Sequence, residues 1–255
     1  AYIYDGTTRL SSGRTFNSST NQASFTLNVQ IPANTTKTLS LYISLSTTAT
    51  TGSAHQFTVE NAGSINATGA SVTGNFPISS NTHTVSGTSA GTITLTKTGS
   101  PSNPRVGDRE VKVSEITLAA ATEDAWVNTL TFTQGGNIAN SALMNFKLKQ
   151  AGTTVATATS VGSNGRLALA FTTPFKIDRG NNRIFELYAD VDGRPADTII
   201  FYVEESADLQ ATGGTFGSGM TSTVTGMDTT AEAHTLTLQG GQFTITFTGP
   251  SSANI

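Results

Sequence analysis

The sequence contains no cysteine and few charged or aromatic side chains. Of its 255 residues, 12% are charged and 7% are aromatic, and the formal net charge is −3. The absence of cysteine excludes disulfides and thiolate metal ligands. The 14 Lys and Arg residues form no basic patch, so nucleic acid is not an expected partner. No apolar run approaches the ~18 residues of a membrane-spanning helix, so we expect no membrane span in this segment.

The polar residues that replace charge are Thr, Ser, Asn and Gly. The charged fraction of 12% is about half of the roughly 25% usual for soluble domains. Hydroxyl-rich surfaces of this kind suit strands and turns, and they are common on secreted proteins. We therefore expect an extracellular or cell-surface location.

An internal repeat organises the chain. The string FTVENAGSINATG at 57–69 returns as FYVEESADLQATG at 201–213, a shift of 144 positions (201 − 57). Extended outward, residues 1 to about 104 parallel residues 146 to about 254, whereas about 105 to 145 occur once. We therefore expect 1–104 to be the C-terminal portion of a repeat and 105–255 to be a complete repeat.

Two accounts of the incomplete first repeat stay open at this point. In one, the sequence is a segment of a longer tandem array. In the other, the strands that the first repeat lacks come from another chain, by donor-strand assembly.

Period-two alternation of apolar residues predicts strands in both copies. In the first copy it covers 25–31, 39–45, 57–59 and 93–95, and the pattern at 93–95 returns at 243–247 as a long last strand. The single-copy stretch adds further strands between 111 and 132. The best helix candidate, 115–126, fits equally well a strand that runs into a turn. These patterns predict an all-β chain of tandem immunoglobulin-like β-sandwich repeats, the first incomplete at its N-terminus.

A family resemblance rests on strings that occur in a fixed order. They are EDAWVNTLTF, SALMNFKLKQAGTTV, FKIDRGNN, FELYADVD and ESADLQATG, and the first copy keeps YIYDGTT, VQIPANTTKTLSLYISL and ENAGSINATG. Together they resemble the immunoglobulin-like repeats of large bacterial cell-surface and S-layer-like proteins. The resemblance implies a role in a surface coat, stalk, filament or adhesin.

Catalytic motifs are not present in the sequence. It has no nucleophile elbow, phosphate-binding loop or HExxH zinc motif. Its three histidines, His55, His83 and His234, lack the spacing of metal ligands, and we expect them to be hydrogen-bonded residues at strand edges. We therefore predict that the chain is not an enzyme.

One candidate metal site lies in DVDGRPAD at 190–197. Asp190, Asp192 and Asp197 place carboxylates around a glycine-containing loop, and oxygen ligands on a turning backbone suit Ca²⁺. Further ligands could come from the acidic residues of 204–208. The alternative is a solvated acidic loop, because Asp-Gly is also common in turns for conformational reasons. No other cofactor is expected.

Trp126 raises the question of glycan stacking. It lies in a strand pattern between Ala125 and Val127, which favours packing in a core or an interface.

The function that these patterns favour is that of a structural repeat module in an extracellular surface layer, stalk or filament. Its partners would be copies of itself or neighbouring repeats, together with the cell envelope or extracellular matrix. The alternative is an adhesin segment that binds a partner glycan or protein through its loops. The sequence identifies no binding residues for that role.

Overall fold

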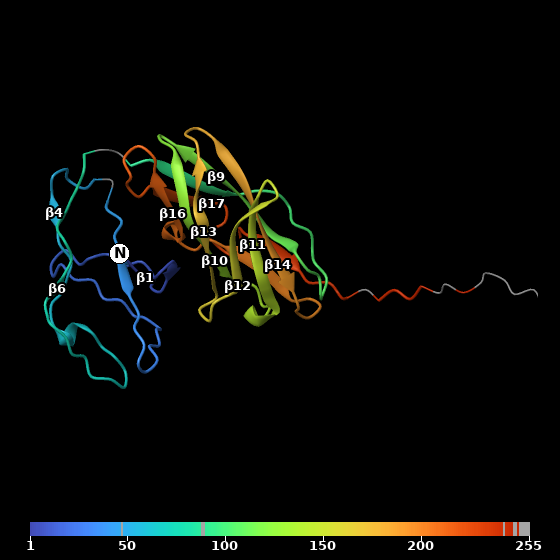
Figure 1. Cartoon of the computed structure of the whole chain (residues 1–255), viewed down its shortest axis with the longest axis horizontal. Coiled ribbons are helices and arrows are strands. Elements are labelled where there is room, and N and C mark those ends of the chain that lie inside the picture. The colour runs from blue at the N-terminus through green and yellow to red at the C-terminus, as the bar shows by residue number, and fades with distance from the viewer. Residues whose placement is uncertain (47, 88–89, 242, 247–248, 250–255) are drawn as a thin grey trace, which may run out of the picture. The chain divides into compact units, whose positions relative to one another are not determined.

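The chain is nearly all β. A computed structural model describes residues 1–46, 48–87, 90–241, 243–246 and 249. These residues divide into two compact units, Ala1 with Tyr42–Ser89 and Tyr2–Leu41 with Ala90–Ile255. Strands account for most of the regular structure, and the helices are short 3₁₀ turns (Figure 1). None of the helices in the described ranges has the length and apolar character needed to cross a membrane.

A curled β-sheet forms most of the second unit. Its elements in chain order are β8 (Thr92–Lys97), β9 (Val111–Ala121), β10 (Ala125–Gln134), η2 (Asn140–Ala142), β11 (Leu143–Gln150), β12 (Thr153–Ser160), β13 (Arg166–Ile177), β14 (Asn182–Val191), β15 (Thr198–Tyr202), η3 (Ser206–Asp208), β16 (Leu209–Gly213), β17 (Thr221–Thr225) and β18 (His234–Thr237).

The strand order is β17-β8-β9-β14-β11-β12-β13-β10-β15-β18, and β16 also pairs with β10. The two halves of this order meet where β12 pairs with β13 at Ala156↔Phe171. The sheet curls there, so that its halves face each other as the two layers of a sandwich (Figure 1).

The core lies between these layers. The ring of Phe146 in β11 meets the ring of Phe201 in β15 edge to face at a centroid distance of 5.7 Å. Phe171 in β13 meets Phe185 in β14 in the same way at 5.9 Å. Burying one such side chain stabilises the fold by roughly 1.5–3 kcal/mol. The predicted alternation is confirmed here, since the buried residues of β14 are spaced two apart, as are those of β9 from Ile116 to Ala120.

The stretch 115–126 is a strand and a turn, and it contains no helix. β9 ends at Ala121, and Thr122 has a positive φ of 76°, which begins the turn into β10. The strand interpretation of this stretch is therefore confirmed.

Strand β8 lies in a different place from the one that its sequence position suggests. It was expected to be the last strand of the first repeat. In the structure it pairs antiparallel with β9, from Thr92↔Ala121 to Lys97↔Ile116, and parallel with β17. Alternation identifies a strand but not its sheet, and the Pro-containing linker at 98–104 lies inside the second unit. The division of the chain into repeats at residue 104 stays a prediction.

The N-terminal segment of the second unit forms a small sheet of its own. β1 (Tyr2–Asp5) pairs with β2 (Thr8–Arg9) around a turn at Gly6, whose φ is 56°, and β3 (Leu39–Tyr42) completes the order β2-β1-β3.

Residues 25–31 are not in a strand, contrary to the prediction. Ile31 is 55% exposed. The matching alternation in β13 pairs with β10, which belongs to the stretch that occurs only once in the sequence. The first copy therefore lacks the partner strand that would make this pattern a sheet.

The first unit contains four short strands and one 3₁₀ turn in its described residues. The strands are β4 (Ala54–His55), β5 (Thr58–Val59), β6 (Ile78–Ser79) and β7 (His83–Thr84), and the turn is η1 (Ala62–Ser64). Strand β4 pairs with β7, and β5 pairs with β6. Both η1 and η3 follow a short strand, and they lie 144 positions apart (206 − 62). The two copies thus share this local feature, while the tandem repeat as a whole stays a prediction.

Candidate functional site

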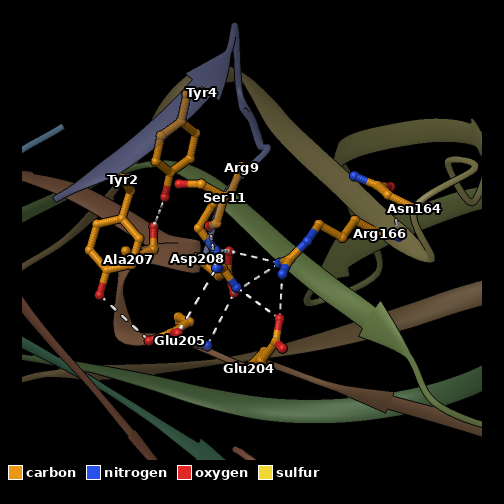
Figure 2. Close-up of polar contacts among 10 residues, drawn as sticks. All are labelled: Tyr2, Tyr4, Arg9, Ser11, Asn164, Arg166, Glu204, Glu205, Ala207 and Asp208. Atoms are coloured by element: carbon orange, nitrogen blue, oxygen red, sulfur yellow. Dashed lines mark hydrogen bonds and ion pairs between the residues drawn. The ribbon is translucent and has the colours of Figure 1, made fainter. Parts of the chain in front are cut away.

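A buried arginine joins two distant parts of the second unit. The β1–β2 hairpin carries Arg9 to η3, which lies about two hundred residues later in the chain (Figure 2). We call Arg9, Arg166, Glu204, Glu205 and Asp208 the arginine cluster.

Arg9 is 1% exposed and makes a two-pronged contact with Asp208, which is also 1% exposed. The Nε and Nη2 atoms of Arg9 donate to Oδ1 and Oδ2 of Asp208 at 2.8 and 3.1 Å. Nη1 donates to the backbone oxygen of Ser11 at 2.8 Å. This geometry uses the planar guanidinium as a fork, which Lys cannot reproduce.

Three further charged residues surround this pair. Nη2 of Arg9 also donates to Oε2 of Glu204 at 2.9 Å, and Glu205 lies 4.0 Å from Nη1. Arg166, from the start of β13, bonds to Glu204 and lies 3.4 Å from the Asp208 carboxylate. Two cations thus face three carboxylates, and the buried positive charge of Arg9 is compensated.

The 3₁₀ turn fixes the acidic side of the cluster. Glu205 and Asp208 form a capping box around η3, in which the backbone N–H of Glu205 donates to Oδ2 of Asp208 at 3.1 Å. Such reciprocal hydrogen bonds satisfy backbone donors at the start of a helix. The Asp208 carboxylate is therefore held by its own turn as well as by the arginines.

Two tyrosines of β1 add contacts beside the cluster. The hydroxyl of Tyr4 donates to the backbone oxygen of Ala207 at 2.7 Å, and that of Tyr2 lies 3.5 Å from Oε2 of Glu205. Arg9 also lies 5.8 Å from the centroid of the Tyr2 ring, within the range of a cation–π contact.

The electrostatics of the cluster favour the charged arginine. Burial alone would lower the pKa of Arg9, but the hydrogen bond and the charge of Asp208, with Glu204 and Glu205, raise it overall. Burial, reinforced by the negative charge of Asp208, raises the pKa of Tyr4. Arg9 therefore stays ionised and Tyr4 stays protonated at any physiological pH.

The chemistry of the cluster is that of a fixed joint. Each of its carboxylates accepts bonds from arginine or lies in contact with it, and these contacts occupy the groups that a substrate would use. The residues of this joint are also not repeated at the corresponding positions of the other copy. At a shift of 146 positions Val155 takes the place of Arg9, and at a shift of 144 Ser64 takes the place of Asp208.

A second buried carboxylate belongs to the turn between β9 and β10, and it contacts the residue just before β8. Glu123 is 4% exposed, and it accepts hydrogen bonds from the backbone N–H of Gly91 at 3.0 Å and of Thr215 at 2.8 Å. A Cβ at Gly91 would lie 2.6 Å from Cγ of Glu123, and one at Gly213 would lie 2.3 Å from its Oε1. Glycine at both positions therefore leaves the space that Glu123 occupies.

The three carboxylates of the calcium hypothesis have separate partners. Asp190 accepts from the Asn145 amide at 2.7 Å and from the Glu110 N–H at 2.8 Å, and these two bonds lower its pKa. Asp192 forms an ion pair with Arg109 at 3.1 Å.

Asp197 accepts from the backbone N–H of Arg194 at 2.8 Å. Within the described part of the chain, no three His, Cys, Asp or Glu side chains gather as a metal site would require. The acidic residues of 204–208, considered as further ligands, belong instead to the arginine cluster. The calcium hypothesis stays a prediction.

The histidines lie at strand pairs. His55 in β4 is paired with His83 in β7. The Nε2 atom of His234 in β18 lies 3.1 Å from the backbone oxygen of Gly99, and burial lowers the pKa of His234. The positions at strand edges agree with the prediction for these residues.

Trp126 lies on the outside of the sandwich. It is 38% exposed, and its cross-strand partners are Lys176 in β13 and Thr212 in β16. Packing in the core, one of the two environments expected for it, is therefore wrong. Packing in an interface stays a prediction.

Sequence analysis missed Arg9 and Arg166 as members of a site. The contact of Arg9 with Asp208 spans 199 positions, and no local pattern in the sequence connects them. The one local signal was the acidic pair at the ends of Glu205-Ser-Ala-Asp208, which fits a capping box at a helix start.

Comparisons with known proteins give weak similarities. No protein-family model and no curated protein matches the chain. Among solved structures, the seventh ScaB type I cohesin from Pseudobacteroides cellulosolvens is similar at 10% identity and a TM-score of 0.34, over 66% of this chain and 99% of that chain. The protein CaCohA2 from Clostridium acetobutylicum is similar at 11% identity and a TM-score of 0.32, over 59% of this chain and 92% of that chain. These values assign the chain to no family.

Proposed function

We propose that the chain is a structural module of an extracellular surface layer, stalk or filament. The observation that carries the proposal is the buried contact between Arg9 and Asp208. It fixes a hairpin near the beginning of the sequence to a turn near its end, and a module that is placed under tension requires fixed connections of this kind. The resemblance of both copies to cell-surface repeats agrees with it.

The module would work without catalysis or a required cofactor. Its partners would be copies of itself or neighbouring repeats, and through them the cell envelope or the extracellular matrix. A surface rich in Thr, Ser and Asn and poor in charge suits such contacts, because hydroxyl and amide groups form hydrogen bonds that depend little on salt.

Surface labelling tests this proposal. An antibody against the purified full chain is applied to intact cells of the organism that encodes it, and separately to permeabilised cells. A surface module should label intact cells along a layer, stalk or filament. Labelling that requires permeabilisation would overturn the proposal.

A second candidate function is that of an adhesin, and the exposure of Trp126 favours it. An outward-facing indole between Lys176 and Thr212 offers an aromatic surface beside polar groups, as sugar-binding sites often do. The full chain and its Trp126→Ala variant can be compared on a glycan array. Binding that is lost in a variant with unchanged melting would support the adhesin, and no binding by the parent chain would contradict it.

A further inference from the structure

Strand β8 completes the sheet of the sandwich from outside the single-copy stretch. Its apolar residues Ile93 and Leu95 are both 0% exposed. The strand lies between β9 and β17, and it pairs with both. Without β8, the two neighbouring strands would be separated and the core between them would open to water.

A second segment of the chain repeats the pattern of β8. Residues 241–246 read GQFTIT and residues 91–96 read GTITLT, a shift of 150 positions (241 − 91). At this shift Phe243 corresponds to Ile93 and Ile245 to Leu95, and Thr244 and Thr246 correspond to threonines.

The structure selects this register over its neighbour. A shift of 152 would superpose Ile245 on Ile93 and would place Phe243 at the position of Gly91. At that position even a Cβ would lie 2.6 Å from Cγ of Glu123 and 2.7 Å from Cε of Met220. The shift of 150 instead places Gly241 there, so the residue that Glu123 requires is present.

The environment of the second segment is the opposite of that of β8. Phe243 is 86% exposed and Ile245 is 79% exposed. Both belong to the described range 243–246, which is not in a strand. Phe247, the last residue expected in this strand, lies outside the described residues. Alternating apolar residues that face water are typical of a strand without its sheet.

We propose that residues 243–246 act as the β8 strand of a homologous sandwich, one that takes this strand from the segment before it and does not supply it itself. Phe243 and Ile245 would enter the places that Ile93 and Leu95 occupy here between β9 and β17, and Gly241 would lie against the residue equivalent to Glu123. This inference rests on the proposed structural role and names its partner.

A peptide exchange experiment tests the proposal on the full chain. The acceptor carries Ile93→Asp and Leu95→Asp, which prevent its own β8 from being buried, and Phe243→Asp with Ile245→Asp, which disable its own second segment. The probe is a synthetic peptide of residues 241–249. At a hundredfold excess over its Kd, binding should raise the melting temperature of the acceptor by about 5–10 °C.

Two control peptides make the result decisive. A peptide of residues 91–99 carries the β8 sequence. It should raise the melting temperature of the acceptor whenever the space between β9 and β17 is formed. The 241–249 peptide with Phe243→Asp and Ile245→Asp should have no effect. If the β8 peptide stabilises the acceptor and the 241–249 peptide does not, the proposal is overturned.

A graft covers the case in which the acceptor does not fold and neither peptide has an effect. The full chain with Ile93→Phe and Leu95→Ile carries the apolar residues of 243–246 within β8. It should keep one cooperative melting transition within about 10 °C of the parent, because a larger side chain in a packed core is only moderately destabilising. Loss of that transition would overturn the proposal. Either failure would leave the surface location unaffected, because antibody labelling tests it separately.

Discussion

The Oε1 atom of Glu123 accepts a hydrogen bond of 3.0 Å from the backbone N–H of Gly91, and this bond fixes the start of β8 to the turn between β9 and β10. The other oxygen of the same carboxylate accepts from Thr215, just after β16. One buried side chain thus connects the start of β8, the turn between β9 and β10, and the segment just after β16.

This relationship predicts a dependence on acid. Hydrogen bonds from Thr215 and Gly91 outweigh burial and hold the pKa of Glu123 below its ordinary value of 4.5. A carboxylate whose pKa is lower in the folded state stabilises the fold above the unfolded pKa, and this contribution is lost as the pH falls through the folded pKa. The parent should therefore lose more melting temperature between about pH 6 and about pH 3 than Glu123→Gln does.

Glu232→Gln is a suitable control for that comparison. The pKa of Glu232 is raised by its hydrogen bond with Asp228 and by the charge of Asp228, so its contribution has the opposite sign. This variant should not reduce the acid loss. Parallel acid curves for the parent and Glu123→Gln would contradict the assignment of Glu123.

Arg9→Ala should release the N-terminal hairpin. It removes both prongs from Asp208 and leaves that carboxylate buried beside the more distant Arg166, a loss of about 3 kcal/mol for a broken buried ion pair. The amide of Leu10, which donates to the oxygen of Ile3 at 2.8 Å, should then exchange its hydrogen roughly 100-fold faster.

The controls for the hairpin experiment are Arg9→Lys and Arg194→Ala. The lysine keeps the charge and loses the fork, so it should give an intermediate exchange rate. Arg194 is exposed, and its replacement should change nothing near β1. Equal exchange in Arg9→Ala and Arg194→Ala would show that Arg9 does not hold the hairpin.

Leu95→Ala should destabilise the sandwich, because β8 belongs to its core. Truncating a fully buried leucine lowers the free energy of unfolding by about 2–5 kcal/mol. The matched variant Leu41→Ala alters a leucine in β3 that is 40% exposed, and it should cost about 0.5 kcal/mol or less. Urea unfolding measures both, and equal effects would mean that β8 is dispensable.

Gly136→Ala should be among the most damaging single-methyl additions. A Cβ there would lie 2.0 Å from the backbone oxygen of Thr198, and Thr198 is the first residue of β15, so relieving the clash would displace that strand or the turn after β10. We expect a loss of about 1–3 kcal/mol or more. Gly219→Ala is the control, since a Cβ at Gly219 meets nothing within 4 Å. Similar melting of the two variants would contradict the crowding at Gly136.

The calcium hypothesis makes its own prediction. If Asp190, Asp192 and Asp197 bind the ion, chelator should lower the melting temperature, since a ligand at a hundredfold excess over its Kd stabilises the fold by about 2.7 kcal/mol. Asp192→Asn should weaken the response, whereas Asp178→Asn, on another loop, should not. A melting curve unaffected by chelator would leave only a set of hydrogen-bonded surface carboxylates.

The sequence was most informative where one face of a strand is buried. Alternation identified β9, β13 and β14 because the core selects every second residue over much of each strand, as at Ile116–Ala120 in β9 and Leu167–Phe171 in β13. It failed at 25–31, where the pattern is present but a partner strand is not. It also could not assign β8 to a sheet, because strand pairing depends on contacts between residues far apart in the chain.

The arginine cluster could not be predicted from the sequence for the same reason, because its contacts join residues far apart in the chain. Only the turn at 205–208 has a local signature, and the residue that completes the cluster comes from the opposite end of the sequence. Trp126 illustrates a related difficulty, since an aromatic residue in a strand pattern can face the core or the outside. Its neighbours Ala125 and Val127 are both 0% exposed, which places Trp126 on the outer face.

The parallel pairing of β8 with β17, from Thr92↔Thr221 to Thr96↔Thr225, has a mechanical consequence. Tension applied between the N-terminal end of β8 and the C-terminal end of β17 pulls these two strands in opposite directions along their length. The hydrogen bonds between them are then loaded in shear, and they must fail together instead of opening one after another from an end. A sandwich held in this way resists stretching more strongly than its thermal stability alone would indicate.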